Sequence, residues 1–253
     1  ERLVGTKGLS RETRTSCPMC RADILLPGLK DHAPRIVERL KKWSKRKCKS
    51  WAQFALGNAY SIGRGVNKDP KRAFKLLKLA ADQGHHHAQY NLSNMYATGD
   101  GVLQSDTLSY KYVKLSAEQG FSEAQYMVGC MYADGTSVAQ SDTEAGKYYK
   151  LAADQGHGKA QNKLAIMYAQ GQGVIQSDTL AFTYFKLSAE GGFAAAQLNV
   201  GIAYSTGTGV EQSDTRSLKF YQLAADQGNH HAQFNLGNIY AQGRGEIQSD
   251  TRA

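Results

Sequence analysis

The sequence predicts an all-α protein, a right-handed α-solenoid built from helix–loop–helix repeats with a 36-residue period. The first observation is the dipeptide Ala-Gln, whose six copies follow one another at intervals of 36 residues, from Ala52 to Ala232. The second is that the copies share columns of apolar, small and aromatic residues, and the third is that they share turn and capping residues. Because one such unit cannot bury its apolar face alone, neighbouring units must stack.

Three segments are expected in order along the chain. Residues 1–33 are an irregular segment with two cysteines, residues 34–50 are a basic linker or capping helix, and residues 51–253 are the repeat array. The array consists of five full repeats and a partial sixth (52–87, 88–123, 124–159, 160–195, 196–231 and 232–253).

The segment 34–50 is predicted to be helical, since Pro34 suits a first turn and the apolar residues share one side. Those residues are Ile36, Val37, Leu40 and Trp43. Two interpretations stay open and are compatible. The apolar side can cap the first repeat, and the basic side, with Lys41, Lys45 and Arg46, can bind an acidic protein, RNA or anionic lipid.

The first helix of each repeat is predicted to run over about residues 52–61 in the first copy. Leu56 and Tyr60 lie four residues apart and so share a helix face. Between them stands a small residue, Gly57 in the first copy, which indicates close approach of a second helix. The Tyr60 column is therefore interpreted as core packing.

The loop that follows reads Gly-x-Gly-Val in most copies, as in Gly63-Arg64-Gly65-Val66. The first glycine suits a left-handed helix end, and the valine can anchor the loop to the core. A nucleotide-binding site would need a preceding strand and a third glycine, and neither is present. These loops are turns.

The second helix is predicted to begin at Asp69-Pro70 in the first copy and at Ser-Asp-Thr in the later copies. A serine beside an aspartate could also mark a phosphorylation or catalytic site, but its recurrence at every helix start favours capping. These helices are expected to end at a glycine, Gly84 in the first copy. The turn residues after that glycine alternate between histidine or asparagine and phenylalanine, which gives a 72-residue super-repeat.

The pattern A-x-x-x-L-G-x-x-Y-x-x-G-x-G-V, followed by a capped helix ending A-A-x-Q-G, resembles the Sel-one-like repeat, a relative of the tetratricopeptide repeat. Ser137 and Glu246 depart from it, in place of a loop glycine and a loop valine. The resemblance implies a scaffold that holds other proteins and performs no chemistry of its own. The partial sixth copy leads us to expect more chain, or a partner, beyond Ala253.

Cys17-Pro18-Met19-Cys20-Arg21 is similar to the closing pair of a RING finger. Two thiolates spaced in this way can hold one zinc ion only if two further ligands exist. Residues 1–16 contain no Cys or His, and His32 and Cys48 do not match the RING pattern. Zinc at Cys17 and Cys20 is therefore expected only with ligands from outside this sequence; a different zinc site and coincidence stay open. A redox pair is disfavoured because no βαβ pattern surrounds it.

Charge, cysteine content and apolar runs limit the classes of partner and the compartment expected for the chain. Residues 1–50 hold 14 Lys or Arg and 5 Asp or Glu, whereas residues 51–253 hold 17 of each, which argues against nucleic acid as a partner of the array. Four cysteines without a regular framework favour a reducing intracellular compartment. The absence of any run of 18 apolar residues predicts that no segment spans a membrane.

Two groups of side chains in the array were candidate sites. Histidines 85–87, 157 and 230–231 fall in the turns between repeats, where a backbone role is favoured over metal binding. Cys130 is expected to be a core thiol. Tyrosines on the second helices are candidate binding anchors for a partner: Tyr110, Tyr112, Tyr148, Tyr149, Tyr184 and Tyr221.

The sequence therefore predicts a non-enzymatic protein-binding scaffold without a cofactor. Two alternatives remain: the substrate-recruiting part of a RING-type ubiquitin ligase, whose partner would be a ubiquitin-conjugating enzyme, and a structural subunit of a large assembly.

Overall fold

The computed structural model describes residues 33–44 and 50–241, and within these ranges it contains twelve α-helices and no strand. The chain divides into two compact units after Gln104. The first holds α2 (Ala33–Ser44), α3 (Ser50–Ile62), α4 (Pro70–Ala81) and α5 (His86–Thr98). The second holds α6 (Asp106–Glu118), α7 (Ser122–Asp134), α8 (Asp142–Ala153), α9 (Gly158–Gln170), α10 (Asp178–Glu190), α11 (Ala194–Thr206), α12 (Asp214–Asp226) and α13 (His230–Ala241).

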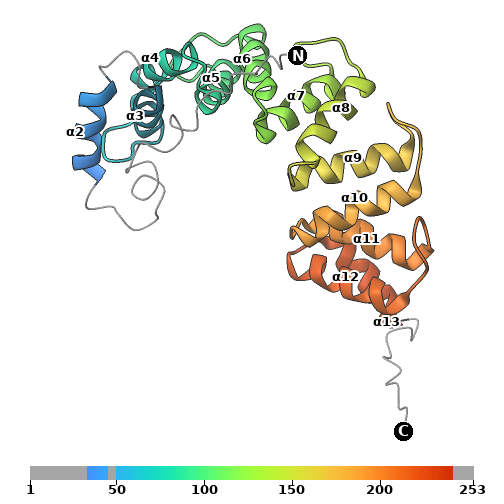
Figure 1. Ribbon diagram of the computed structural model, residues 1–253. Helices are drawn as coiled ribbons and strands as arrows, with labels where there is room; N and C mark the ends of the chain where they lie inside the picture. Colours follow the sequence, from blue (N-terminus) through green and yellow to red (C-terminus); the bar gives the residue numbers. More distant parts are fainter. Residues whose placement is uncertain (1–32, 45–49, 242–253) are drawn as a thin grey trace, which may run out of the picture. The chain divides into compact units, whose positions relative to one another are not determined.

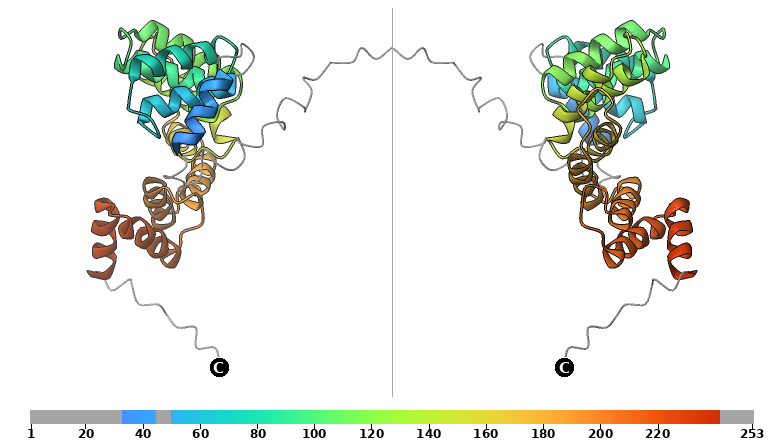
Figure 2. Two further views of the ribbon diagram at one scale, coloured as in Figure 1. Left: turned by 90° about the vertical axis from the view of Figure 1, so that its left-hand side faces the viewer. Right: turned by 90° about the vertical axis from the view of Figure 1, so that its right-hand side faces the viewer.

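Within each unit the helices stack in chain order, and each packs against its neighbours in the sequence (Figures 1 and 2). The odd-numbered helices from α3 to α13 are the first helices of the repeats, and the even-numbered helices from α4 to α12 are the second helices. The predicted all-α solenoid of 36-residue helix pairs is therefore confirmed.

Helix α2 packs on α3 as a capping helix. Val37 and Leu40 are buried, and the ring of Trp43 meets that of Trp51 edge-on with centroids 5.2 Å apart. The helix is shorter than the predicted segment 34–50, because α2 ends at Ser44 and a separate helix begins at Ser50.

The predicted helix boundaries rest on local hydrogen bonds. The carboxylate of Asp69 accepts a hydrogen bond from the Arg72 N–H at 3.0 Å, so Asp69 caps α4 ahead of Pro70. A serine caps each of the next four second helices in the same way, which confirms the capping interpretation: Ser105, Ser141, Ser177 and Ser213. The first loop glycine ends α5, α7, α9 and α11 in the left-handed conformation, as predicted.

The second helices end earlier than expected. Helix α4 stops at Ala81, and Gly84 lies three residues later with φ +84°. The Gly84 N–H donates to the Ala81 carbonyl, so the glycine closes a turn after the helix instead of ending it.

In the third and fifth repeats, the small residue in the middle of the first helix makes room for a tyrosine ring. A β-carbon at Gly129 would lie 2.6 Å from Cδ1 of Tyr149, and one at Gly201 would lie 2.6 Å from Cδ1 of Tyr221. No real β-carbon comes so close, so glycine is required where the second helix carries a tyrosine. Where that residue is Ala165, the residue of α10 in the same core cluster is Phe185.

The tyrosine column of the first helices contributes to the core only in part. Tyr60, Tyr96 and Tyr204 are buried and Tyr132 and Tyr168 are half-buried, but Tyr240 is 58% exposed. Tyr240 lies on α13, the last helix within the described residues. The prediction of core packing is therefore wrong for Tyr240.

The second loop glycine lies in close contact with the backbone of the preceding repeat. Gly173 has φ +65°, and a β-carbon there would lie 2.3 Å from the carbonyl carbon of Asp142, at the start of α8. Gly209 approaches Asp178, at the start of α10, in the same way. In the third repeat Ser137 replaces this glycine and keeps the left-handed conformation, with φ +66°.

Candidate protein-binding surface

Three of the six candidate tyrosines lie in the core, which corrects the prediction that they are binding anchors. Tyr112, Tyr149 and Tyr221 are 8%, 2% and 4% exposed. Tyr149 and Tyr221 fill the spaces above Gly129 and Gly201. A side chain buried in this way offers a partner almost no surface.

The other three tyrosines are half-buried and pair with rings of first helices. The hydroxyl oxygens of Tyr110 and Tyr132 lie 2.9 Å apart. Tyr148 stacks on Tyr132 with ring centroids 5.8 Å apart, and Tyr184 stacks on Tyr168 at 5.7 Å. Burial raises the pKa of Tyr110 and Tyr148 above the ordinary value, so both phenols are neutral at physiological pH. Each of these three tyrosines remains partly exposed.

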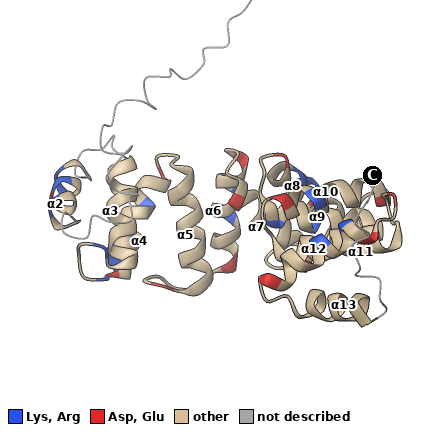
Figure 3. Cartoon of the chain, turned by 90° about the horizontal axis from the view of Figure 1, so that it is seen from below, with Lys and Arg blue, Asp and Glu red and all other residues tan. Residues whose placement is uncertain are grey.

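The candidate residues near the N-terminus are only partly within the described chain. Lys41 on α2 contacts Glu38, with 2.5 Å between Nζ and Oε1, and this hydrogen bond raises the pKa of the lysine. Figure 3 shows the basic residues of α2 in blue. Lys45, Arg46 and the proposed zinc ligands Cys17 and Cys20 lie outside the described residues.

Two of the candidate histidines, His85 and His157, lie in inter-repeat turns and cap helices, whereas His86 and His87 lie within α5 and His230 and His231 within α13, which corrects the prediction that all six lie in turns. Nδ1 of His85 accepts a hydrogen bond from the Ala88 N–H at 3.3 Å, and His157 caps the α9 helix in the same way. At the start of α13 the side-chain oxygen of Asn229 accepts the equivalent hydrogen bond from the Ala232 N–H, which explains why histidine and asparagine share this position. Burial under the stacked ring of Phe54 and the nearby histidines His86 and His87 lower the pKa of His85 to about 4. Within the described ranges no group of three His, Cys, Asp or Glu residues could hold a metal ion.

The glutamine of the Ala-Gln dipeptide has a function that the sequence did not reveal. Nε2 of Gln125 on α7 donates to the carbonyl oxygen of Ala117 near the end of α6, at 3.2 Å. Its Oε1 accepts from Nε2 of Gln155, at the end of α8, at 2.6 Å. The same donor bond recurs at Gln89, Gln161 and Gln197. These glutamines therefore connect the last turn of one repeat to the first helix of the next.

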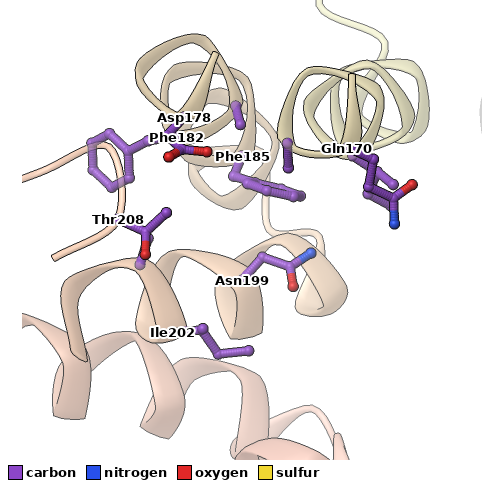
Figure 4. A pocket seen from close by; sticks show the side chains of 11 residues that line it. Gln170, Asp178, Phe182, Phe185, Asn199, Ile202 and Thr208 are labelled. Carbon is purple, nitrogen blue, oxygen red and sulfur yellow. The ribbon is translucent and has the colours of Figure 1, made fainter. Parts of the chain in front are cut away.

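A pocket of about 380 Å³ opens between two successive first helices, α9 and α11, with α10 between them; we call it the α9–α11 pocket. Figure 4 shows Asp178, Phe182 and Phe185 of α10 on one side, and Asn199 and Ile202 of α11 with the loop residue Thr208 on the other. Phe185 is buried and belongs to the core, whereas Ile202 is 40% exposed. The pocket thus combines an apolar floor with a polar edge.

The lining of this pocket is chemically mixed. Ile166, Phe182 and Ile202 present apolar surface, and Asp178, Asn199 and Thr208 supply hydrogen-bonding groups at the edge. The residues that line the pocket include no His, Cys, Lys or Ser that could act with Asp178 as a nucleophile or base. An apolar side chain of a partner fits such a site.

A second pocket, of about 210 Å³, lies at the equivalent place between the first helices α3 and α5; we call it the α3–α5 pocket. Its lining is mostly polar: Asn58 and Ser61 from α3, Asn91, Asn94 and Thr98 from α5, and the loop residue Asp100, with Leu77 and Met95 beneath. Both pockets are therefore built from the same part of the repeat with different side chains.

One sequence signal could have located these pockets. The columns of Leu56 and Tyr60 hardly change between copies, but the position two residues after the Leu56 column reads Asn58, Asn94, Cys130, Ile166, Ile202 and Asn238. At this position Asn58, Asn94, Ile166 and Ile202 line the two pockets, although Cys130 and Ile166 also pack against the core. The variation therefore marks a surface on which the repeats differ.

Comparison with known proteins agrees with this fold. The Sel1 repeat family matches six consecutive segments of the chain, residues 52–85, 86–121, 122–157, 158–193, 194–229 and 230–253. The chain belongs to the Sel1 repeat family. The matches begin at residue 52, so they give no support to a RING-finger remnant at Cys17 and Cys20. None of the curated proteins matches the chain.

Two solved structures are similar to the chain. A protective antigen present in uropathogenic Escherichia coli strains, described as displaying an SLR fold, is 32% identical with a TM-score of 0.79. The similarity covers 87% of this chain but 50% of the antigen, so the chain spans about half of its length. A Sel1 repeat protein from Oxalobacter formigenes is 27% identical with a TM-score of 0.71, over 88% of this chain and 92% of that protein. None of the helices described in this chain is long and apolar enough to cross a membrane.

Proposed function

We propose that the repeat array is a non-enzymatic scaffold that binds other proteins, and that the α9–α11 pocket receives an apolar side chain of the partner. The observation that carries this proposal is Ile202, which is 40% exposed and lines the pocket on the side opposite Phe182 (Figure 4). Covering a large apolar side chain fully contributes about 1.5–3 kcal/mol, so even partial covering of Ile202 favours binding.

The family supports the same function. A stack of repeats exposes an extended surface to which each repeat contributes one first helix, and proteins of this architecture use such surfaces to bind partners. The two other functions expected from the sequence were a part of a RING-type ubiquitin ligase and a subunit of a large assembly. Nothing in the described residues favours either.

The test is selection of ligands from a phage-displayed random peptide library on the whole chain, followed by affinity measurements with two variants. Ile202→Lys puts a charge at the pocket. Leu223→Lys is the matched control, because Leu223 on α12 is 41% exposed and does not line the pocket. Both positions tolerate lysine in a helix, and circular dichroism checks the fold.

We expect Ile202→Lys to weaken binding of the selected peptides about tenfold, since it removes apolar contact worth roughly 1–2 kcal/mol. Leu223→Lys should leave the affinity within about twofold, because exposed substitutions away from a binding site have small effects. Equal affinities for the wild-type protein and both variants would show that the pocket is not used. A loss confined to Leu223→Lys would place binding on the second helices instead.

A further inference from the structure

We propose that the α3–α5 pocket binds the main chain of an extended peptide through the side-chain amides of Asn58, Asn91 and Asn94. This inference rests on the proposed function, since it assumes that the array binds proteins. It adds which chemical groups of the partner the first unit recognises.

The three amides converge on one pocket from two helices. Asn58 on α3 and Asn94 on α5 occupy the same position in successive repeats, and both line the pocket. Asn91 lies three residues before Asn94, so the two share a face of α5. The pocket therefore presents a row of carboxamides that crosses the boundary between two repeats.

These amides have no hydrogen-bond partner within the described part of the chain, although all three side chains are half-buried. The glutamines of the same unit behave differently. Gln53 donates to the Ser44 carbonyl at 3.1 Å, and Gln89 donates to the Ala81 carbonyl at 3.3 Å. The polar groups that hold the repeats together are thus bonded, whereas those of the α3–α5 pocket are left for another molecule.

The fold does not need asparagine at these positions. The equivalents of Asn58 in later repeats are Asn94, Cys130, Ile166, Ile202 and Asn238, and those of Asn91 are Ala55, Met127, Lys163, Asn199 and Asn235, so other side chains are accepted at both positions. Asparagine is also a poorer helix former than alanine, because its side chain competes for backbone hydrogen bonds. Three such residues in the middle of two helices therefore indicate a binding role.

The ligand follows from the chemistry of the carboxamide. Each asparagine offers N–H donors and a carbonyl acceptor, which complement the C=O and N–H of a peptide unit. A helical partner satisfies its own main chain, so only an extended segment has these groups free. Asp100 is the one charged residue among those lining the pocket. Without a cation in that lining, a nucleic acid phosphate is disfavoured.

The size of the pocket agrees with a stretch of main chain. Its volume of about 210 Å³ is below the roughly 300–1,000 Å³ typical of small-molecule sites. It equals the space of about seven water molecules. A short peptide segment that replaces ordered water there can restore each hydrogen bond.

The experiment uses the same peptide library, panned on the whole chain with counter-selection against the double variant Asn58→Ala, Asn94→Ala. We expect enrichment of peptides that bind the wild-type protein and bind the double variant about tenfold more weakly. The matched control is Asn67→Ala, because Asn67 is an exposed asparagine of the same unit that does not line the pocket. It should bind these peptides as the wild-type protein does.

Main-chain recognition is then tested on the selected peptides themselves. Methylation of one backbone nitrogen should weaken binding about tenfold, whereas replacing the side chain of the same residue by alanine should change it less than about threefold. Thermal melting of the double variant should be no lower than that of the wild-type protein, because no internal hydrogen bond is removed and alanine favours helix.

Several results would overturn the inference. One is equal binding to the double variant, a second is tolerance of every backbone methylation, and a third is binding of a single-stranded RNA oligonucleotide in place of peptides. Peptides that are sensitive to Ile202→Lys but not to the double variant would leave the proposed function intact and remove only this inference. A library that yields no ligand would contradict both.

Discussion

Gly173→Ala measures how strongly neighbouring repeats depend on the second loop glycine. Gly173 has φ +65°, and the added β-carbon would lie 2.3 Å from the carbonyl carbon and 2.4 Å from the carbonyl oxygen of Asp142. Gly156→Ala is the matched control, because Gly156 has φ +83° but no atom within 4 Å of its added β-carbon. The two substitutions share the backbone cost and differ only in the contact with the preceding repeat.

The magnitude follows from these two terms. A left-handed conformation costs a residue other than glycine about 1–2 kcal/mol, which applies to both variants. Carbon atoms prefer separations of about 3.5–4.0 Å, so the β-carbon at position 173 must push α8 away by more than about 1 Å. Overpacking of this kind costs about 1–3 kcal/mol. We expect Gly156→Ala to lower the free energy of unfolding by about 1 kcal/mol and Gly173→Ala by about 3 kcal/mol.

The assay is urea unfolding followed by far-ultraviolet circular dichroism, with midpoints and slopes compared between the two variants. A repeat array need not unfold in one step, so a second, earlier transition in Gly173→Ala alone would also show the broken contact. If the two variants lose the same free energy of unfolding within about 0.5 kcal/mol, the reasoning is refuted, because the contact with Asp142 then contributes nothing to stability.

Three further predictions concern side chains of the repeat boundaries. Ser137→Gly should raise the free energy of unfolding by up to about 1 kcal/mol in a urea titration, because it relieves a left-handed residue at the cost of a more flexible unfolded chain; a loss of stability would contradict this. Gln125→Ala should lower it by about 1–3 kcal/mol, since it removes two hydrogen bonds that contribute about 0.5–1.5 kcal/mol each; an unchanged midpoint would mean that the glutamine bonds are dispensable. The pKa of His85 is about 6.5 in the unfolded chain and about 4 in the folded chain. The contribution of His85 to stability is therefore complete above about pH 6.5 and falls as the pH drops toward 4. The loss is at most about 3 kcal/mol, and solvent screening reduces it. His85→Asn, which copies the cap at Asn229, should remove this dependence in melting curves between those pH values, and an identical pH profile would rule out His85 as its source.

The fold could be predicted from the sequence because the 36-residue period repeats every local signal several times. Asp69 and the capping serines mark the starts of their helices, because each side chain accepts a hydrogen bond from the backbone N–H three residues later. The tyrosines were harder to place. Tyr110 and Tyr112 stand two positions apart, which puts them on different faces of one helix, and only the structure shows which of the two faces the core.

The contacts between repeats and the two pockets were harder to predict, because their parts come from different helices and repeats. Gln125 bonds to residues 8 positions before and 30 positions after it, so no local pattern shows its role. The two pockets likewise combine side chains from two successive first helices. The position between the Leu56 and Tyr60 columns carries the remaining signal, through its change from Asn58 to Ile202.

The central claim is that partners bind between the first helices of successive repeats. Its most direct test is photo-crosslinking of a selected peptide to the whole chain, with benzoylphenylalanine introduced either at Ile202 or at Leu223, two positions of nearly equal exposure. We predict a peptide crosslink from position 202 and none from position 223. A crosslink from position 223 alone would contradict the claim and move the binding surface to the second helices.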